Sequence, residues 1–180
     1  MNEPRASVEI QNWSESTYKI NITPDLLSTG MVNNYELKQD YITLKEVDEE
    51  YKLNINSYIG RKIKNNETNQ ENIYFKINYV DTYMDYVKYN ITVKNNNSKT
   101  IYLDTKKDVK TMYLEDKKGI KYSAITNEIK KEDLIYIPLD EKTFDIKYYS
   151  KYSSSKTIMK LVFSNVIFDS NEDKVISINM

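Results

Sequence analysis

The stretch Asp85–Asn97 (DYVKYNITVKNNN) constrains the fold of this chain more than any other. Apolar or aromatic residues occupy every second position from residue 87 to residue 93. On an extended chain, one face therefore carries Val87, Tyr89, Ile91 and Val93. Strict alternation over this length predicts a β-strand with one face in a core and the other face in water. We interpret this stretch as the central strand of a β-sandwich.

Shorter alternating segments occur along the rest of the chain, and none shows a sustained helical period. We expect strands at residues 7–12, 17–22, 40–47, 51–58, 73–79, 99–104, 109–115, 120–123, 134–137, 143–149, 157–168 and 175–180. Many short strands separated by turns are typical of an antiparallel sandwich or barrel. A helical turn is expected in each of Pro24–Met31 and Thr126–Asp133. The polar segment Arg61–Glu71 is expected to form a long exposed loop.

The same pattern predicts one main domain and one extension. Residues 1–38 are assigned to an N-terminal, β-rich extension that contains a hairpin and a short helical turn. Residues 39–180 are assigned to an antiparallel β-sandwich, for which the chain is long enough. The predicted core residues share the inward phase of their strands. They are Val87, Tyr89, Ile91, Val93, Phe144, Ile146, Leu161 and Phe163.

Composition argues against several classes of function. The chain has 180 residues and a net charge of −1, with 26 basic residues interspersed among 27 acidic ones. A nucleic-acid binder would carry a basic tract or patch, so we expect no nucleic-acid partner. The chain has no histidine and no cysteine, and its three glycines form no phosphate-binding loop. We therefore expect no metal, no cofactor and no catalytic activity.

The sequence also bears on location. The longest apolar runs fall far short of the roughly 20 residues that a membrane-spanning helix requires. The residues that follow Met1 are polar and do not have the pattern of a signal peptide. A chain without cysteine fits either the cytosol or the exported proteins of bacteria that avoid disulfides. We expect any signal or membrane anchor to lie outside this chain.

Residues in the second half of the chain follow the pattern of a known family. The pattern is a strand ending in asparagine, a segment of the form L-x-D-x-x-G-x-x-Y, and a strand ending in L-x-F. Its residues here are Asn95, Leu114, Asp116, Gly119, Tyr122, Leu161 and Phe163. The region Ile73–Phe168 resembles the immunoglobulin-like domain of unknown function found in exported bacterial lipoproteins and membrane-anchored envelope proteins, which is similar in fold to a secreted mycobacterial antigen. The resemblance implies an immunoglobulin-like sandwich and an extracytoplasmic location, and it implies no catalytic residues.

Acidic residues raise two further kinds of site. Asp169, Asn171 and Asp173 begin like a calcium-binding loop, but Lys174 stands where that loop needs glycine and Met180 where it needs glutamate. A pair of carboxylates flanking a cleft would support glycoside hydrolysis. The Asp and Glu residues of this chain are spread among predicted turns, which favours a solvated surface.

The strongest candidate for a binding surface is aromatic. Tyr148 has the phase of the core positions in its strand, so Tyr149 points to the opposite face. Tyr86 likewise lies out of phase with the core positions of the central strand, while Lys151 and Tyr152 follow Tyr149 in a polar loop. Exposed tyrosines can stack on sugars or anchor a protein interface. The predicted interaction surface therefore consists of Tyr86, Tyr149, Lys151 and Tyr152; ordinary strand propensity on a half-wet sheet is the alternative explanation.

Two classes of function follow from these observations. The first is a non-catalytic, extracytoplasmic module of the bacterial cell envelope that contacts a protein or a glycan, or that spaces other domains. The second is a carboxylate-dependent glycoside hydrolase or other envelope enzyme, and a cytosolic scaffold is a third, weaker alternative. A flat or shallow surface lined with tyrosine would favour the first class, and a pocket with two close carboxylates would favour the second.

We predict that Ile91→Ala lowers the free energy of unfolding by about 2–5 kcal/mol, because it removes core methylene groups and leaves a cavity. Urea denaturation followed by circular dichroism measures the change. A variant as stable as the parent, or a spectrum dominated by helix, would contradict the interpretation of the central strand.

Overall fold

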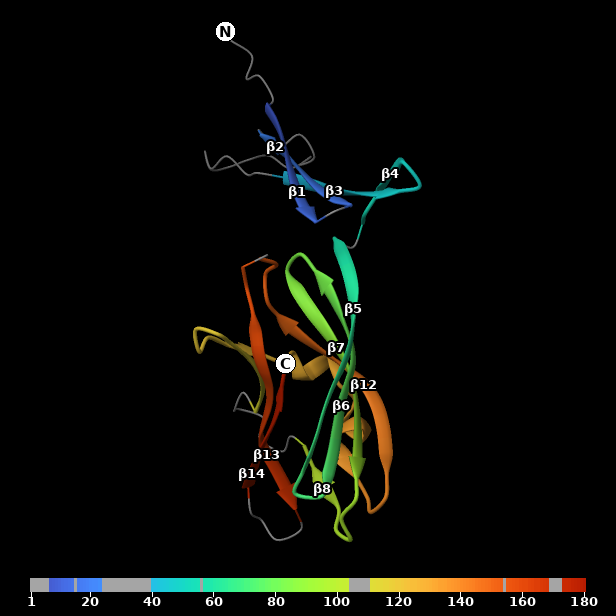
Figure 1. The fold of residues 1–180 in the computed structure, drawn as a ribbon, viewed down its shortest axis with the longest axis vertical. Helices are drawn as coiled ribbons and strands as arrows, with labels where there is room; N and C mark the ends of the chain where they lie inside the picture. The colour runs from blue at the N-terminus through green and yellow to red at the C-terminus, as the bar shows by residue number, and fades with distance from the viewer. Residues whose placement is uncertain are drawn as a thin grey trace. The chain divides into compact units, whose positions relative to one another are not determined.

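The computed structural model of the protein is all-β, and its sheets are antiparallel (Figure 1). It describes residues 7–14, 16–23, 40–55, 57–103, 111–153, 155–168 and 173–180. Contacts between residues divide the chain into one unit of residues 1–59 and a second unit of residues 60–180. Helical structure in the described ranges consists of two short 3-10 turns, η1 (Thr126–Glu128) and η2 (Lys131–Leu134). η1 lies within Thr126–Asp133, where a helical turn was expected, and η2 extends one residue beyond that segment. The other expected helical turn, Pro24–Met31, lies outside the described residues.

The first unit contains a sheet with the strand order β1-β2-β3-β4. Its strands are β1 (Ser7–Ser14), β2 (Thr17–Thr23), β3 (Asp40–Val47) and β4 (Glu50–Leu53). The two hairpins expected in this region are present, and Ile20 of β2 lies opposite both Ile10 of β1 and Ile42 of β3. Such cross-strand apolar pairs stabilise a sheet. The second hairpin therefore extends the N-terminal sheet, and the division falls after residue 59 where the sequence had placed it after residue 38.

The second unit is a sandwich of two sheets, visible as two layers in Figure 1. The first layer has the order β12-β7-β6-β5. In the second layer, β13 pairs with β14, β9 and β8, while β10 pairs with β9 and β11 pairs with β8. The strands are β5 (Tyr58–Gln70), β6 (Ile73–Tyr83), β7 (Tyr86–Asn95), β8 (Ile101–Tyr102), β9 (Met112–Asp116), β10 (Lys121–Ser123), β11 (Ile135–Tyr136), β12 (Glu141–Tyr149), β13 (Ile158–Phe168) and β14 (Asp173–Asn179).

The predicted core is confirmed. Tyr89, Ile91, Val93, Phe144, Ile146, Leu161 and Phe163 are buried in one cluster, and Val87 packs against it. The rings of Phe75 in β6 and Phe163 in β13 lie 5.0 Å apart, centroid to centroid, so side chains from both layers meet in this core. The alternation in β7 thus marks the face that is turned toward the opposite sheet.

The expectation of a loop at Arg61–Glu71 is wrong, because residues 58–70 form β5, the edge strand beside β6. Its inward side chains are polar and bond to the backbone of β14. Asn66 Nδ2 donates to the oxygen of Asn179 (3.0 Å), and Gln70 Nε2 donates to the oxygen of Ser177 (2.8 Å). Gln70 Oε1 also accepts from the N–H of Ser177 (3.3 Å). Amide side chains replace apolar packing here, so the strand shows no hydrophobic alternation.

The L-x-D-x-x-G-x-x-Y segment forms the turn between β9 and β10. Asp116 Oδ1 accepts hydrogen bonds from the backbone N–H groups of Lys118 and Ile120, both at 2.9 Å, and Oδ2 accepts from the Tyr122 hydroxyl (2.9 Å). Gly119 has a φ of 78°, in the left-handed region that favours glycine. Burial opposes the charge of Asp116, but these hydrogen bonds outweigh it and hold the pKa of the carboxyl below its ordinary value. The segment is a structural turn.

Asn95 ends β7 and is fully buried. Its Nδ2 donates to the backbone oxygens of Lys99 (2.8 Å), Tyr136 (3.0 Å) and Ile137 (3.1 Å). Its Oδ1 accepts from the backbone N–H of Asn97 (2.9 Å). Because Tyr136 belongs to β11 of the second layer, this one amide joins the end of β7 to the opposite sheet.

We predict that Asn95→Ala lowers the free energy of unfolding by about 3 kcal/mol or more, because the buried carbonyl of Tyr136 and two part-buried carbonyls lose their donor at once. Asn95→Asp should also destabilise, since a carboxylate would face those carbonyl oxygens without an N–H to offer. Urea denaturation measures both changes. The exposed neighbour Asn96 supplies the control, and Asn96→Ala should change stability by less than about 0.5 kcal/mol. Equal losses for the two alanine variants would refute the structural role of the Asn95 amide.

Candidate functional site

The residues of the predicted interaction surface lie in two places. Tyr86 and Tyr149 are directly opposite each other on β7 and β12, on the face of the sheet that points away from the core. Tyr149 is 67% exposed, and Tyr86 is half-buried. Lys151 and Tyr152 follow in the loop after β12, where both line a cleft. The structure therefore brings the two tyrosines together and assigns the other two residues to a separate feature.

We call the first feature the tyrosine face and define it by Tyr83, Tyr86 and Tyr149. The rings of Tyr83 and Tyr86 are stacked, with centroids 4.2 Å apart and planes inclined by 17°. Lys147 Nζ lies 4.4 Å from the centroid of the Tyr86 ring and 3.2 Å from Glu128 Oε1. Burial and the nearby Tyr83 raise the pKa of Tyr86, an effect that Lys147 opposes. These contacts fix the Tyr83–Tyr86 stack and leave Tyr149 as the exposed ring beside it.

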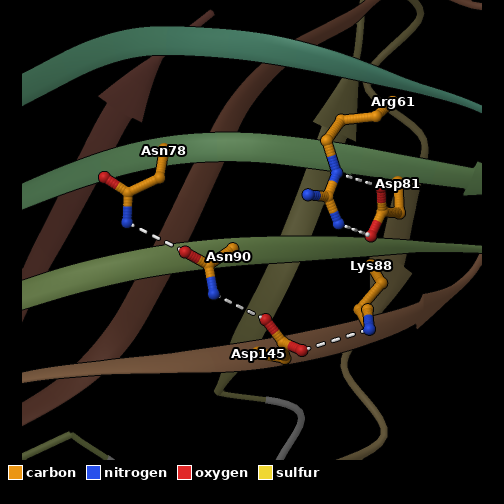
Figure 2. Close-up of polar contacts among 6 residues, drawn as sticks. All are labelled: Arg61, Asn78, Asp81, Lys88, Asn90 and Asp145. Carbon is orange, nitrogen blue, oxygen red and sulfur yellow. Dashed lines mark hydrogen bonds and ion pairs between the residues drawn. The ribbon is translucent and has the colours of Figure 1, made fainter.

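A row of polar side chains crosses the same face of the sheet, as Figure 2 shows. Asn78 Nδ2 donates to Asn90 Oδ1 (2.9 Å), and Asn90 Nδ2 donates to Asp145 Oδ1 (2.7 Å). Lys88 Nζ lies 3.1 Å from Asp145 Oδ2. Burial lowers the pKa of Lys88, but its hydrogen bond to Asp145 and the charge of that carboxylate more than offset this, so the pKa is raised. We call these four residues the polar ladder; its members satisfy one another's hydrogen-bonding groups.

A second polar contact ties the edge strand β5 to β6 on this face (Figure 2). Arg61 Nε lies 2.8 Å from Asp81 Oδ1, and Arg61 Nη2 donates to Asp81 Oδ2 (2.9 Å). The guanidinium carbon also sits 3.7 Å from the centroid of the Tyr79 ring. Asp81 is only 3% exposed, so its carboxylate depends on this bidentate partner.

The second feature is a cleft of about 370 Å³ within residues 60–180. Lysines enter its lining from two distant parts of the chain. We call it the lysine cleft and define it by Lys62, Lys64, Lys151 and Lys156. Sequence reasoning identified Lys151 but missed the other three. The available signal was the spacing of Lys62 and Lys64, which places both on one face if residues 61–71 form a strand.

Acidic residues are sparse in the clefts of the second unit. Two clefts of about 210 and 310 Å³ contain one acidic side chain each, Asp116 and Glu71 respectively. Among the described residues, no three Asp or Glu side chains gather in a way that could hold a metal ion. Asp169 and Asn171 of the calcium-like segment lie outside the described residues, which resume at Asp173. The described part of the chain also contains no helix long and apolar enough to cross a membrane.

Comparison with family models, curated proteins and solved structures found no match to this chain. The resemblance to the immunoglobulin-like envelope domain therefore stays a prediction from the sequence. Its polar motif residues have structural roles here. Asn95 connects the two layers, while Asp116, Gly119 and Tyr122 build a turn.

We predict that Arg61→Met lowers the free energy of unfolding by about 2–3 kcal/mol, since the carboxylate of Asp81 stays buried but loses the two hydrogen bonds from the guanidinium. The free energy of unfolding of Arg61→Lys should lie between those of Arg61→Met and the parent, because lysine keeps the positive charge but cannot make the bidentate contact. Chemical denaturation provides the measurement. Lys76→Met is the matched control, as it removes a half-buried lysine from the same sheet and should cost less than about 0.5 kcal/mol. A loss in Arg61→Met no larger than in this control would contradict the prediction.

Proposed function

We propose that the chain is a non-catalytic binding module with an immunoglobulin-like sandwich, which works in the bacterial cell envelope and contacts a protein partner through the tyrosine face. The observation that carries this proposal is the arrangement of that face. An exposed ring stands beside a fixed pair of stacked rings, and the neighbouring polar groups are already bonded to one another.

Strand order supports the immunoglobulin-like part of the proposal. In such sandwiches, strands A, B and E share one sheet, and strands G, F and C share the other. Equating β6, β7 and β12 with A, B and E matches the order found in the first layer. Equating β14, β13 and β9 with G, F and C matches the second layer, with β10 as an additional strand beyond C. The edge strand β5 is then an addition outside strand A.

The chemistry of the tyrosine face favours a protein over a glycan. Sugar hydroxyls need polar groups that are free to bond, whereas Asn90 and Asp145 of the polar ladder are bonded to each other. Tyrosine and arginine are the residues that dominate the binding energy of protein interfaces. A flat sheet face with a rigid aromatic centre loses little side-chain freedom when a partner docks on it.

The arrangement of charged groups favours a binding module over the hydrolase alternative. Glycoside hydrolysis requires two carboxylates on either side of the bond that is broken. In the described part of the chain, the lining of the cleft of about 370 Å³ contains lysines and no Asp or Glu, and the linings of two other clefts contain a single acidic residue each. The envelope location rests on the resemblance of the motif residues alone. Protease added to intact cells tests it, because an exported module would be cleaved and a cytosolic one spared.

We predict that Tyr149→Ala weakens binding to an envelope protein by about 2 kcal/mol or more, because an exposed aromatic anchor is lost. Tyr86→Ala should act in the same direction, since it removes one ring of the stack. Biolayer interferometry measures binding to solubilised envelope proteins, and to purified envelope polysaccharide in a second arm. The stability of Tyr149→Ala should stay within about 0.5 kcal/mol of the parent.

Tyr113 supplies a matched control for Tyr86 on the other layer. It is also a half-buried tyrosine with a lysine over its ring, since Lys121 Nζ lies 4.5 Å from the ring centroid. Tyr113→Ala should leave binding unchanged. The proposal of a protein partner at the tyrosine face would be contradicted if Tyr113→Ala and Tyr149→Ala weakened binding equally. It would also be contradicted if the parent bound only the polysaccharide.

A further inference from the structure

The lysine cleft concentrates positive charge in a protein whose net charge is close to zero. The whole protein has a net charge of −1, yet this cleft is lined by Lys62, Lys64, Lys151 and Lys156. Among the described residues, its lining contains no Asp or Glu. A concave site with one sign of charge concentrates its field and attracts ions of the opposite sign.

Two of the lysines point inward from the edge strand. Lys62 and Lys64 alternate in register with Asn66 and Gln70, whose side chains bond to the backbone of β14. All four side chains therefore leave β5 on the side of the second layer. Inward-pointing charge also discourages edge strands from pairing with other chains. That role accounts for Lys62 and Lys64 only, because the other two lysines come from the loop after β12.

The loop lysine Lys156 is held in place before any ligand binds. Its Nζ donates to Ser150 Oγ (2.9 Å) and to the backbone oxygen of Lys151 (2.5 Å), and lies 4.6 Å from the centroid of the Tyr122 ring. The loop itself is bonded to the turn before β7, through Tyr152 N–H to the oxygen of Met84 (2.6 Å). Lys156 is thus preorganised, which reduces the entropy that this side chain loses on binding.

The positive charge of the cleft is poorly compensated. Burial lowers the pKa of Lys64, and the like charge of Lys62 lowers it further. Burial also lowers the pKa of Lys156, although the charge of Asp116 acts in the opposite sense. The Asp116 carboxylate already accepts hydrogen bonds from Lys118, Ile120 and Tyr122 in its own turn. A bound anion would relieve the repulsion between Lys62 and Lys64.

We propose that the lysine cleft binds the phosphate group of a small organic phosphate. Lysine binds phosphate as a point charge, while recognition of a planar carboxylate favours arginine, which the cleft lining does not contain. Several ammonium groups from two directions suit a compact group with several charged oxygens. Apolar side chains of Val80, Val87 and Ile158 also line the cleft and offer a surface for the organic part. The volume falls within the range of small-molecule sites.

The phosphate could come from a free phosphate monoester or from one unit of a phosphodiester polymer, and both share this chemistry. Isothermal titration calorimetry at low salt, with the full chain, distinguishes the two sources. The probes are inorganic phosphate, glycerol phosphate as the monoester, and a glycerol phosphodiester. Citrate serves as a carboxylate anion of similar size.

The test variant is Lys62→Gln/Lys64→Gln, which leaves the loop and the core unchanged. Its matched control is Lys130→Gln/Lys131→Gln, which removes the same charge from an exposed turn outside the cleft. We expect the tighter of the two esters to bind about tenfold more weakly to the test variant, whereas the control should stay within about twofold of the parent. Lys151→Gln provides a second variant, in case the double substitution impairs folding.

The proposal is supported if either ester binds the parent and loses affinity in the cleft variants only; the preferred ester then identifies the source. It is overturned if no phosphate probe binds, if the control loses as much affinity as the test variant, or if citrate binds as tightly as the esters. The tyrosine face is untouched by these variants, so failure here is distinguishable from failure of the proposed protein contact.

Discussion

A buried amide joins the two layers of the sandwich at the end of β7. Asn95 uses its backbone as well as its side chain: its N–H donates to the oxygen of Asp140, and its own oxygen accepts from the N–H of Leu139. With the side-chain bonds to Lys99, Tyr136 and Ile137, the end of β7 is fixed both to the opposite layer and to the segment that leads into β12. The pairing of β12 with β7 begins directly beside this junction, with Glu141 opposite Lys94.

The edge of the sandwich beside β5 is closed by polar chemistry instead of apolar packing. Asn66 and Gln70 bond to the backbone of β14, and Lys62 and Lys64 line the cleft farther along the same strand. Polar groups that lose contact with water need hydrogen-bond partners, and these half-buried amides find them in the backbone of β14. The lysines avoid that requirement because the cleft remains open to solvent. The strand β5 thus provides polar contacts to β14 and part of the lining of the lysine cleft.

The sequence was sufficient for the features that depend on hydrophobic phase. The alternation in β7 predicted which side chains lie in the core, and the same phase argument put Tyr149 on the outer face, where it is exposed. It failed for β5, because a strand whose inward positions are Lys, Asn and Gln has no apolar period to detect. The sequence placed Asn95 at the end of a strand without predicting its burial, since nothing local distinguishes a buried asparagine from an exposed one. The lysine cleft could not be predicted either, because its lysines lie far apart in the sequence, at residues 62 and 64 and at residues 151 and 156. No local pattern indicates that the fold brings these segments together.

The loop after β12 has a consequence for how the two features relate. It begins at Tyr149, the exposed ring of the tyrosine face, and within a few residues supplies Lys151 and Lys156 to the cleft. Its backbone is bonded to Met84 and Asp85, directly before Tyr86. If an anion bound by Lys151 and Lys156 changes the free energy with which a partner docks on the rings, thermodynamic reciprocity requires the partner to change the affinity for the anion by the same factor. Binding at the tyrosine face and binding at the lysine cleft would then be coupled through the short backbone segment that they share.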